Sequence, residues 1–200
     1  APYVPQPHAQ LPAEACFDRP YVVVHPMPRY AYKAWSSNNW SALVRRLNDA
    51  GVKVVLTGGN NASELAAIRD IVPEGADAVI LAGKLSFGQT AELIARSKGF
   101  VGPDTGTTHV ASSTGVPIVT LFGPSDPTAW GPWGRGQTKP FDSRNDGVPQ
   151  RRGNVILLKK HCKCQGGMGC LNRRDSHSDC LNELTVDEVW DALKELEVVA

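Results

Sequence analysis

The sequence predicts an α/β protein built on a Rossmann-like, mostly parallel sheet. Short apolar runs of strand length, at residues 21–25, 52–57, 77–82, 100–101 and 118–122, alternate with segments of helical periodicity. Strands that alternate with helices in this way form parallel sheets with right-handed crossovers. We find no internal repeat, so a single continuous sheet is expected.

Helix signals mark the segments that follow the strands. Apolar spacing predicts helices over about residues 40–50, 63–72, 86–96 and 106–114, and a Ser-x-x-Gln capping box opens the third of them. A Thr-x-x-Glu capping box predicts a final helix over about residues 185–196. These signals account for most of the chain between the strands.

Four further segments complete the chain. Residues 1–19 are rich in proline and predict a linker or extended arm in front of one domain over residues 20–200. Residues 123–153, rich in Gly, Pro and Trp, show neither helical nor strand periodicity, and a loop of that length usually either acts on a ligand or is mobile. Residues 154–158 are a candidate last strand, and residues 161–181 form a Cys-rich segment.

Composition narrows the class of protein. Hydrophobic residues make up 42% of the chain and the formal net charge is +1, which is typical of a globular domain and argues against a dedicated nucleic-acid binder. No apolar run approaches the ~20 residues that span a bilayer. The first residues lack a signal-peptide pattern. We therefore expect a cytoplasmic location.

Four of the five cysteines cluster near the C-terminus, at Cys162, Cys164, Cys170 and Cys180. In a cytosolic protein such a cluster favours a structural zinc site, and in an exported protein it favours two disulfides. Either would stabilise a segment that has little apolar core of its own.

A strand, a turn and a helix follow one another at the centre of the chain. Gly102 and Pro103 end an apolar strand, Asp104 or Thr105 can cap the next helix, and Gly106 allows a ligand close to its first turn. A helix that starts just beyond the carboxyl end of a strand is where open α/β sheets bind phosphate. An anion site is predicted here.

The motif Asp104-Thr105-Gly106-x-x-His109, followed by Gly-Val-Pro at 115–117 and Leu-Phe-Gly-Pro at 121–124, resembles the donor-site signature of family 9 glycosyltransferases. These are the heptosyltransferases that build the inner core of lipopolysaccharide. The similarity extends from about Tyr21 to the C-terminus and matches the family's second half. It implies the nucleotide-sugar domain of a GT-B enzyme, without the acceptor domain and the catalytic base of the first half.

The resemblance assigns a role to each candidate residue. Lys33 contacts a phosphate, Thr105, Gly106 and Thr107 donate to the diphosphate, and Asp104 accepts from sugar hydroxyls. His109 either faces the phosphates or packs against backbone, and Leu85 lies where backbone meets the base. Asn61 stands where relatives place an acidic residue for the ribose. The expected donor residues are Lys33, Asn61, Leu85, Asp104, Thr105, Gly106, Thr107 and His109.

The same resemblance implies partners and chemistry. The donor is a nucleotide-diphosphate sugar, with ADP favoured and UDP or GDP left open, and transfer needs no metal or other cofactor. The acceptor is a glycolipid, which would place the enzyme at the inner face of the bacterial inner membrane. Seven basic residues are candidates for a face toward a phosphorylated acceptor: Arg151, Arg152, Lys159, Lys160, Lys163, Arg173 and Arg174.

Two other classes of function remain open from the residues. One is a nucleotide-sugar epimerase on the same architecture, against which Lys33-x-Trp35 and the Leu-Phe-Gly-Pro element speak. The other is a non-enzymatic module that binds a nucleotide or a sugar phosphate.

Overall fold

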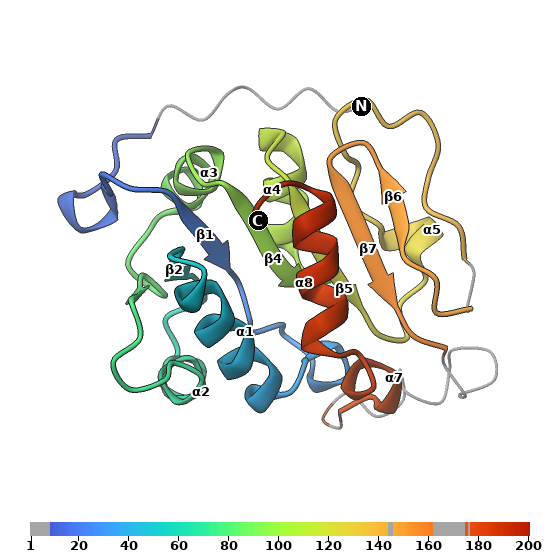
Figure 1. The fold of residues 1–200 in the computed structure, drawn as a ribbon, viewed down its shortest axis with the longest axis horizontal. Coiled ribbons are helices and arrows are strands. Elements are labelled where there is room, and N and C mark those ends of the chain that lie inside the picture. The colour runs from blue at the N-terminus through green and yellow to red at the C-terminus, as the bar shows by residue number, and fades with distance from the viewer. Residues whose placement is uncertain (1–8, 144–145, 162–174, 176) are drawn as a thin grey trace.

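The computed structural model describes residues 9–143, 146–161, 175 and 177–200. Its described strands form one seven-stranded sheet in the order β3-β2-β1-β4-β5-β7-β6 (Figure 1). All neighbours are parallel except β6, which pairs antiparallel with β7 at one edge. The strands are β1 Tyr21–Val24, β2 Lys53–Leu56, β3 Ala78–Ile80, β4 Gly99–Pro103, β5 Ile118–Phe122, β6 Gln150–Arg152 and β7 Val155–Lys159. The predicted fold class is confirmed.

Helices cover both faces of the sheet (Figure 1). Core residues of α1, α2 and α8 pack on one face, and those of α3 and α4 pack on the other. Alternate residues of β1 serve the two cores, because successive strand side chains point to opposite faces: Val22 and Val24 to one, Val23 to the other. The helices are α1 Ser37–Asp49, α2 Ala62–Asp70, α3 Phe87–Ala95, α4 Gly106–Thr114, α5 Pro127–Trp130, α7 Asp179–Asn182 and α8 Val186–Glu195, with 3-10 turns η1 Ala13–Ala15 and η2 Ala31–Lys33.

The strand order reverses direction at β1. Val22 pairs with Val54 of β2 on one side and with Gly99 of β4 on the other, and later strands add outward from each. The connections that leave the carboxyl ends of β1 and β4 therefore diverge and leave a crevice, which is where open α/β sheets bind ligands.

The structure corrects two expected boundaries. Helix α1 begins at Ser37 and not near Trp40, because the Ser36 side chain accepts a hydrogen bond from the Asn39 N–H and caps it earlier. The predicted loop 123–153 contains the short helix α5, capped by Asp126, and the edge strand β6. In contrast, the capping boxes before α3 and α8 are both formed.

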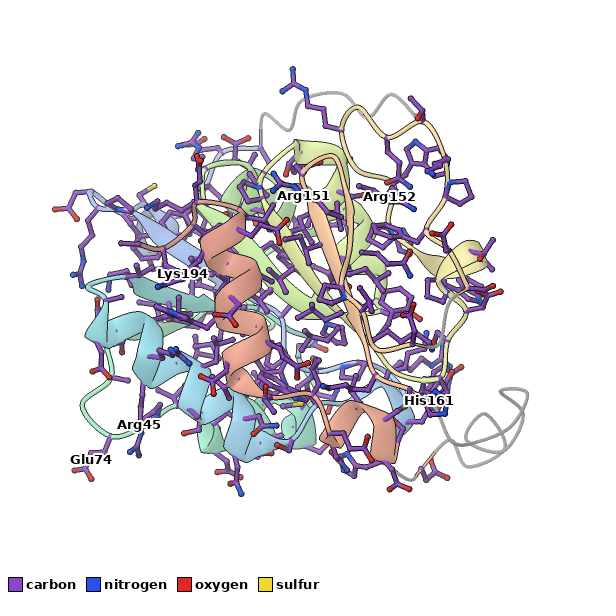
Figure 2. The ribbon with its side chains drawn as sticks, turned by 45° about the vertical axis from the view of Figure 1, so that its right-hand side comes forward. Arg45, Glu74, Arg151, Arg152, His161 and Lys194 are labelled. Atoms are coloured by element: carbon purple, nitrogen blue, oxygen red, sulfur yellow. The ribbon has the colours of Figure 1, made fainter. Side chains whose placement is uncertain are left out.

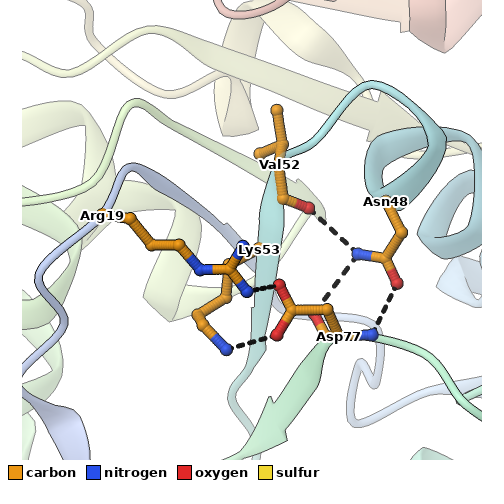
Figure 3. A network of polar contacts seen from close by, with 5 residues as sticks. All are labelled: Arg19, Asn48, Val52, Lys53 and Asp77. Carbon is orange, nitrogen blue, oxygen red and sulfur yellow. Dashed lines mark hydrogen bonds and ion pairs between the residues drawn. The ribbon is translucent and has the colours of Figure 1, made fainter.

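Residues 9–19 pack on the domain, with Leu11 and Ala15 buried in the core on the α3 and α4 face. A polar network holds the end of this segment, at Arg19, beside the amino-terminal ends of β2 and β3 (Figure 3). The Asp77 carboxylate pairs with Arg19 and, at 2.5 Å, with Lys53, and the Asn48 side chain accepts from the Asp77 N–H at 2.9 Å. These bonds join four segments on the side of the sheet opposite the crevice.

Within the described residues, no helix is long and apolar enough to cross a membrane.

Candidate functional site

A buried ion pair lies at the carboxyl end of β4. The Lys33 ammonium, on η2, contacts the Asp104 carboxylate at 2.6 Å, and their side chains are only 17% and 4% exposed. The same ammonium lies 5.8 Å from the ring centre of Tyr32 and 5.9 Å from that of Trp130, within the range of cation–π attraction. Asp104 and Trp130, which are far from Lys33 in the sequence, therefore both lie beside its ammonium at the crevice.

The start of α4 lies directly beyond Asp104 and is open to a ligand. Thr105 caps the helix by accepting from the Thr108 N–H, and the Thr108 hydroxyl donates to Pro103 O at 2.6 Å. The N–H groups of Gly106 and Thr107 donate no hydrogen bond within the described part of the chain. A Cβ built at Gly106 would meet no atom within 4 Å. Unpaired N–H groups at a helix start favour an anion.

A cavity of about 180 Å³ adjoins this helix start through Thr107. Apolar side chains, including Leu85 and Phe87, form part of its wall, and His25 and Thr57 supply polar atoms. Apolar walls with a few fixed polar groups are typical of a pocket for a small-molecule ligand. The cavity is lined by His25, Thr57, Gly58, Leu81, Leu85, Phe87, Thr90, Thr107 and Val110.

His25 and Thr57 are site residues that the sequence reasoning missed. Each directly follows a buried strand, β1 or β2, and His25 Nδ1 lies 3.0 Å from Thr57 Oγ1. Burial lowers the pKa of His25 from 6.5 to about 4, so the ring is neutral at pH 7. A polar residue placed directly after a run of buried apolar residues at the end of a parallel strand was the available signal.

His109 lies on the exposed side of α4, one turn beyond the cap. Desolvation lowers its pKa below the ordinary value; the Asp104 carboxylate acts against this shift and the Lys33 ammonium adds to it. Its ring makes no hydrogen bond in the described part of the chain, so it is not a packed histidine that donates to a carbonyl.

Asn61 lies apart from this group, at the start of α2. Its side-chain oxygen accepts from the Glu64 N–H at 2.9 Å and from the Ser63 hydroxyl at 2.8 Å. The Glu64 carboxylate in turn accepts from Asn61 Nδ2 at 2.9 Å and from the Gly59 N–H at 2.6 Å. The Glu64 carboxylate, in the first turn of α2, is therefore engaged in the helix cap.

The structure brings most of the predicted residues to one corner. Lys33, Asp104, Thr105, Gly106, Thr107 and His109 surround the start of α4, and Leu85 joins them through the cavity.

The proposed basic face is not formed by its described members. Lys159 is buried and donates to the carbonyls of Gly123 at 2.5 Å and Ser125 at 3.1 Å. The others pair with carboxylates: Arg151 with Glu195, Arg152 with Asp142 and Lys160 with Glu188. Figure 2 shows Arg151 and Arg152 where β6 ends and β7 begins, and His161, which follows Lys160, beyond the other end of β7. The two arginines and Lys160 therefore do not lie together. Lys163, Arg173 and Arg174 lie outside the described residues.

The cysteine cluster is described only at Cys180, which is buried in α7. Cys162, Cys164 and Cys170 lie outside the described residues, so zinc or disulfides at these positions stay a prediction.

Comparison with known proteins gives consistent matches. The sequence model described as "Glycosyltransferase family 9 (heptosyltransferase)" matches residues 4–158. Lipopolysaccharide heptosyltransferase 3 of Escherichia coli is 34% identical over 115 residues, which cover 56% of this chain and 34% of that protein. Lipopolysaccharide heptosyltransferase 2 of E. coli K12 is 36% identical over 100 residues, 48% of this chain and 28% of that one. The chain thus spans about a third of the length of the curated relatives it matches.

Solved structures share the fold. E. coli ADP-heptose lps heptosyltransferase II superposes with a TM-score of 0.70 and 23% identity, over 96% of this chain and 55% of that one. E. coli heptosyltransferase WaaC with ADP superposes with a TM-score of 0.66 and 22% identity, over 93% and 46%.

Proposed function

The chain belongs to glycosyltransferase family 9, and from that premise we propose that it binds the nucleotide-diphosphate sugar of a heptosyltransferase-like reaction. The observation that carries this proposal is the Lys33–Asp104 pair beside the open start of α4. Structural relatives described with ADP and with ADP-2-deoxy-2-fluoro heptose favour an ADP-sugar as donor.

The groups at the crevice match the parts of such a donor. The N–H groups of Gly106 and Thr107 and the ammonium of Lys33 would bind the diphosphate. Asp104 would accept hydrogen bonds from sugar hydroxyls, and the cavity beside Leu85 would hold the nucleoside. When the bond from the anomeric carbon to the diphosphate oxygen breaks, negative charge grows on the leaving diphosphate. Donors already fixed at that oxygen stabilise the transition state without a metal.

Transfer itself needs more than these groups. An acceptor oxygen must attack the anomeric carbon in line with the leaving diphosphate, and a base must take its proton. The carboxylates near the donor site, Asp104 and Asp126, are engaged in the Lys33 pair and in the α5 cap. We assign the acceptor site and the base to an N-terminal domain, and the acceptor to a lipopolysaccharide-core glycolipid at the inner face of the inner membrane.

A binding test comes first. ADP-heptose and ADP should raise the melting temperature of the 200-residue chain more than UDP or GDP. A ligand present at a hundred times its Kd stabilises the folded state by about 2.7 kcal/mol, which a thermal-shift measurement detects. No shift with any nucleotide or nucleotide sugar would contradict the proposal.

A transfer test separates the enzyme half from its rivals. The chain alone should bind ADP-heptose yet leave a rough lipopolysaccharide-core acceptor unmodified, and addition of a separately expressed N-terminal family 9 domain should restore transfer. Conversion of the donor's sugar to an epimer would favour the epimerase, and binding that no N-terminal domain converts into transfer would favour a module.

We also propose that the four clustered cysteines hold one structural zinc. Elemental analysis of protein purified under reducing conditions should give about one zinc per chain. Four oxidised thiols with no metal would replace the zinc site with two disulfides.

A further inference from the structure

Two large apolar side chains are exposed at the crevice, one on either side of the α4 start. Phe87 is 73% exposed and lines the cavity that also contains Leu85. Trp130 is 58% exposed and lies beside the Lys33 ammonium. The indole is within cation–π range of the Lys33 ammonium and leaves more than half of its surface in water beside the site, where a ligand can contact it.

The backbone holds Trp130 in this exposed position. Its N–H donates to Asp126 O at 2.9 Å, and the Asp126 side chain caps the same turn. The next residue, Gly131, donates to Pro127 O, and a Cβ there would lie 2.5 Å from that oxygen. The turn therefore tolerates only glycine after the tryptophan. The Lys159 ammonium, which binds the carbonyls just before α5, fixes the approach to it.

The order of the strands places the two aromatic residues at opposite ends of a bound donor. The cavity with Phe87 adjoins the ends of β1 and β2, through His25 and Thr57. The diphosphate site at α4 follows β4, and Trp130 follows β5, the next strand outward. A donor with its diphosphate on α4 and its nucleoside in the cavity therefore carries its sugar toward the β5 side.

We propose that Trp130 is the residue that recognises the sugar, with its indole face packed against the C–H face of the pyranose. The inference rests on the proposed function and deepens it. With one sugar face on the indole, the hydroxyls turn toward Asp104, which lies beside the same Lys33 ammonium. An aromatic side chain suits this task because it supplies a large rigid apolar face at the edge of water. Through this contact, Trp130 makes the site bind a nucleotide sugar more tightly than the bare nucleoside diphosphate.

Calorimetry of the 200-residue chain with ADP and with ADP-heptose tests this role. Trp130→Ala should weaken ADP-heptose about tenfold and change the Kd of ADP less than about twofold. Trp130→Phe should recover part of the loss. The matched control is Phe87→Ala, which removes the exposed aromatic at the nucleoside end and should weaken both ligands by the same factor.

The outcomes are distinguishable. A wild-type chain that binds neither ligand overturns the proposed function and this inference with it. A wild type that binds both, with an unchanged ratio of the two dissociation constants in Trp130→Ala, overturns this inference alone. Circular dichroism would show whether Trp130→Ala is unfolded. In that case the ratio of the ADP and ADP-heptose dissociation constants is measured in Trp130→Phe, and an unchanged ratio there overturns the inference.

Discussion

Two helices, α2 and α4, begin at the same edge of the sheet, and only one of them is open to an anion. At α2, Glu64 lies in the first turn, and its carboxylate accepts from the Gly59 N–H and the Asn61 amide. At α4 no acidic residue lies in the first turn, and the N–H groups of Gly106 and Thr107 have no partner within the described chain.

The difference shows what a helix start needs in order to bind phosphate. Both starts follow a parallel strand, and both have glycine nearby, so neither property separates them. At α2 a Cβ on Gly58 would meet Ile68 at 2.6 Å and Glu64 at 2.8 Å, whereas at α4 a Cβ on Gly106 would meet nothing. A helix start can bind an anion only where the protein's own carboxylates and side chains leave its N–H groups accessible, as at α4 and not at α2.

The largest expected effect comes from filling that space. Gly106→Val should weaken ADP-heptose at least about 1,000-fold, or ~4 kcal/mol, because its methyl groups occupy the place of the diphosphate. Its free energy of unfolding should change little. Gly58→Val, the matched change at the other turn, should destabilise the fold by about 1–3 kcal/mol through overpacking against Ile68 and Glu64. Urea unfolding and calorimetry check both, and a Gly106→Val chain that binds normally would move the site elsewhere.

Removal of the cation should affect both stability and binding. Lys33→Ala leaves the buried Asp104 carboxylate without its partner, which should cost about 3 kcal/mol in the free energy of unfolding, measured in urea. The double variant Lys33→Met with Asp104→Asn should recover most of that stability but not the binding of ADP-heptose. If the double variant also recovers binding, Lys33 has only a structural role.

The pH dependence of stability tests the buried His25 ring in the wall of the cavity beside α4. The folded pKa of His25, about 4, lies below the unfolded value of 6.5, so the folded state binds fewer protons. This contribution to stability is present above pH 6.5 and is lost as the pH falls toward 4. Between pH 8 and pH 5 the loss from this group should be about 2 kcal/mol. His25→Gln should flatten this part of a urea-unfolding pH profile, and an unchanged slope would contradict the buried neutral ring.

The smallest effect is expected at α2. Glu64→Gln removes a carboxylate from the first turn and should cost about 0.5–1 kcal/mol of stability. The binding of ADP should stay near the wild-type value. If ADP binding falls more than about tenfold, or ~1.4 kcal/mol, Glu64 contacts the nucleotide and the site extends to α2.

Local signals in the sequence predicted much of the fold and of the α4 corner. Buried parallel strands such as β1 and β5 are continuous apolar runs, and capping boxes are visible as short motifs. The edge strand β6 has no such signal, because Gln150 and the two arginines after it are placed by pairing with β7.

Contacts between distant segments could not be predicted. Lys159 looks like a surface residue in the sequence, yet its partners are carbonyls about 35 residues away in the chain. The His25–Thr57 contact likewise requires that β1 and β2 be neighbours. In both cases the chemistry depends on which strands meet, which residue types alone do not reveal.

The most direct test of the central claim follows backbone amides during titration with ADP by two-dimensional nitrogen–proton NMR. If the diphosphate binds the open helix start, the amide signals of Gly106 and Thr107 should shift most, with downfield proton shifts as their N–H groups gain acceptors. The amides of Gly59 and Glu64, already bonded within α2, should move little. The reverse pattern, with Gly59 and Glu64 shifted and Gly106 and Thr107 unchanged, would contradict the account.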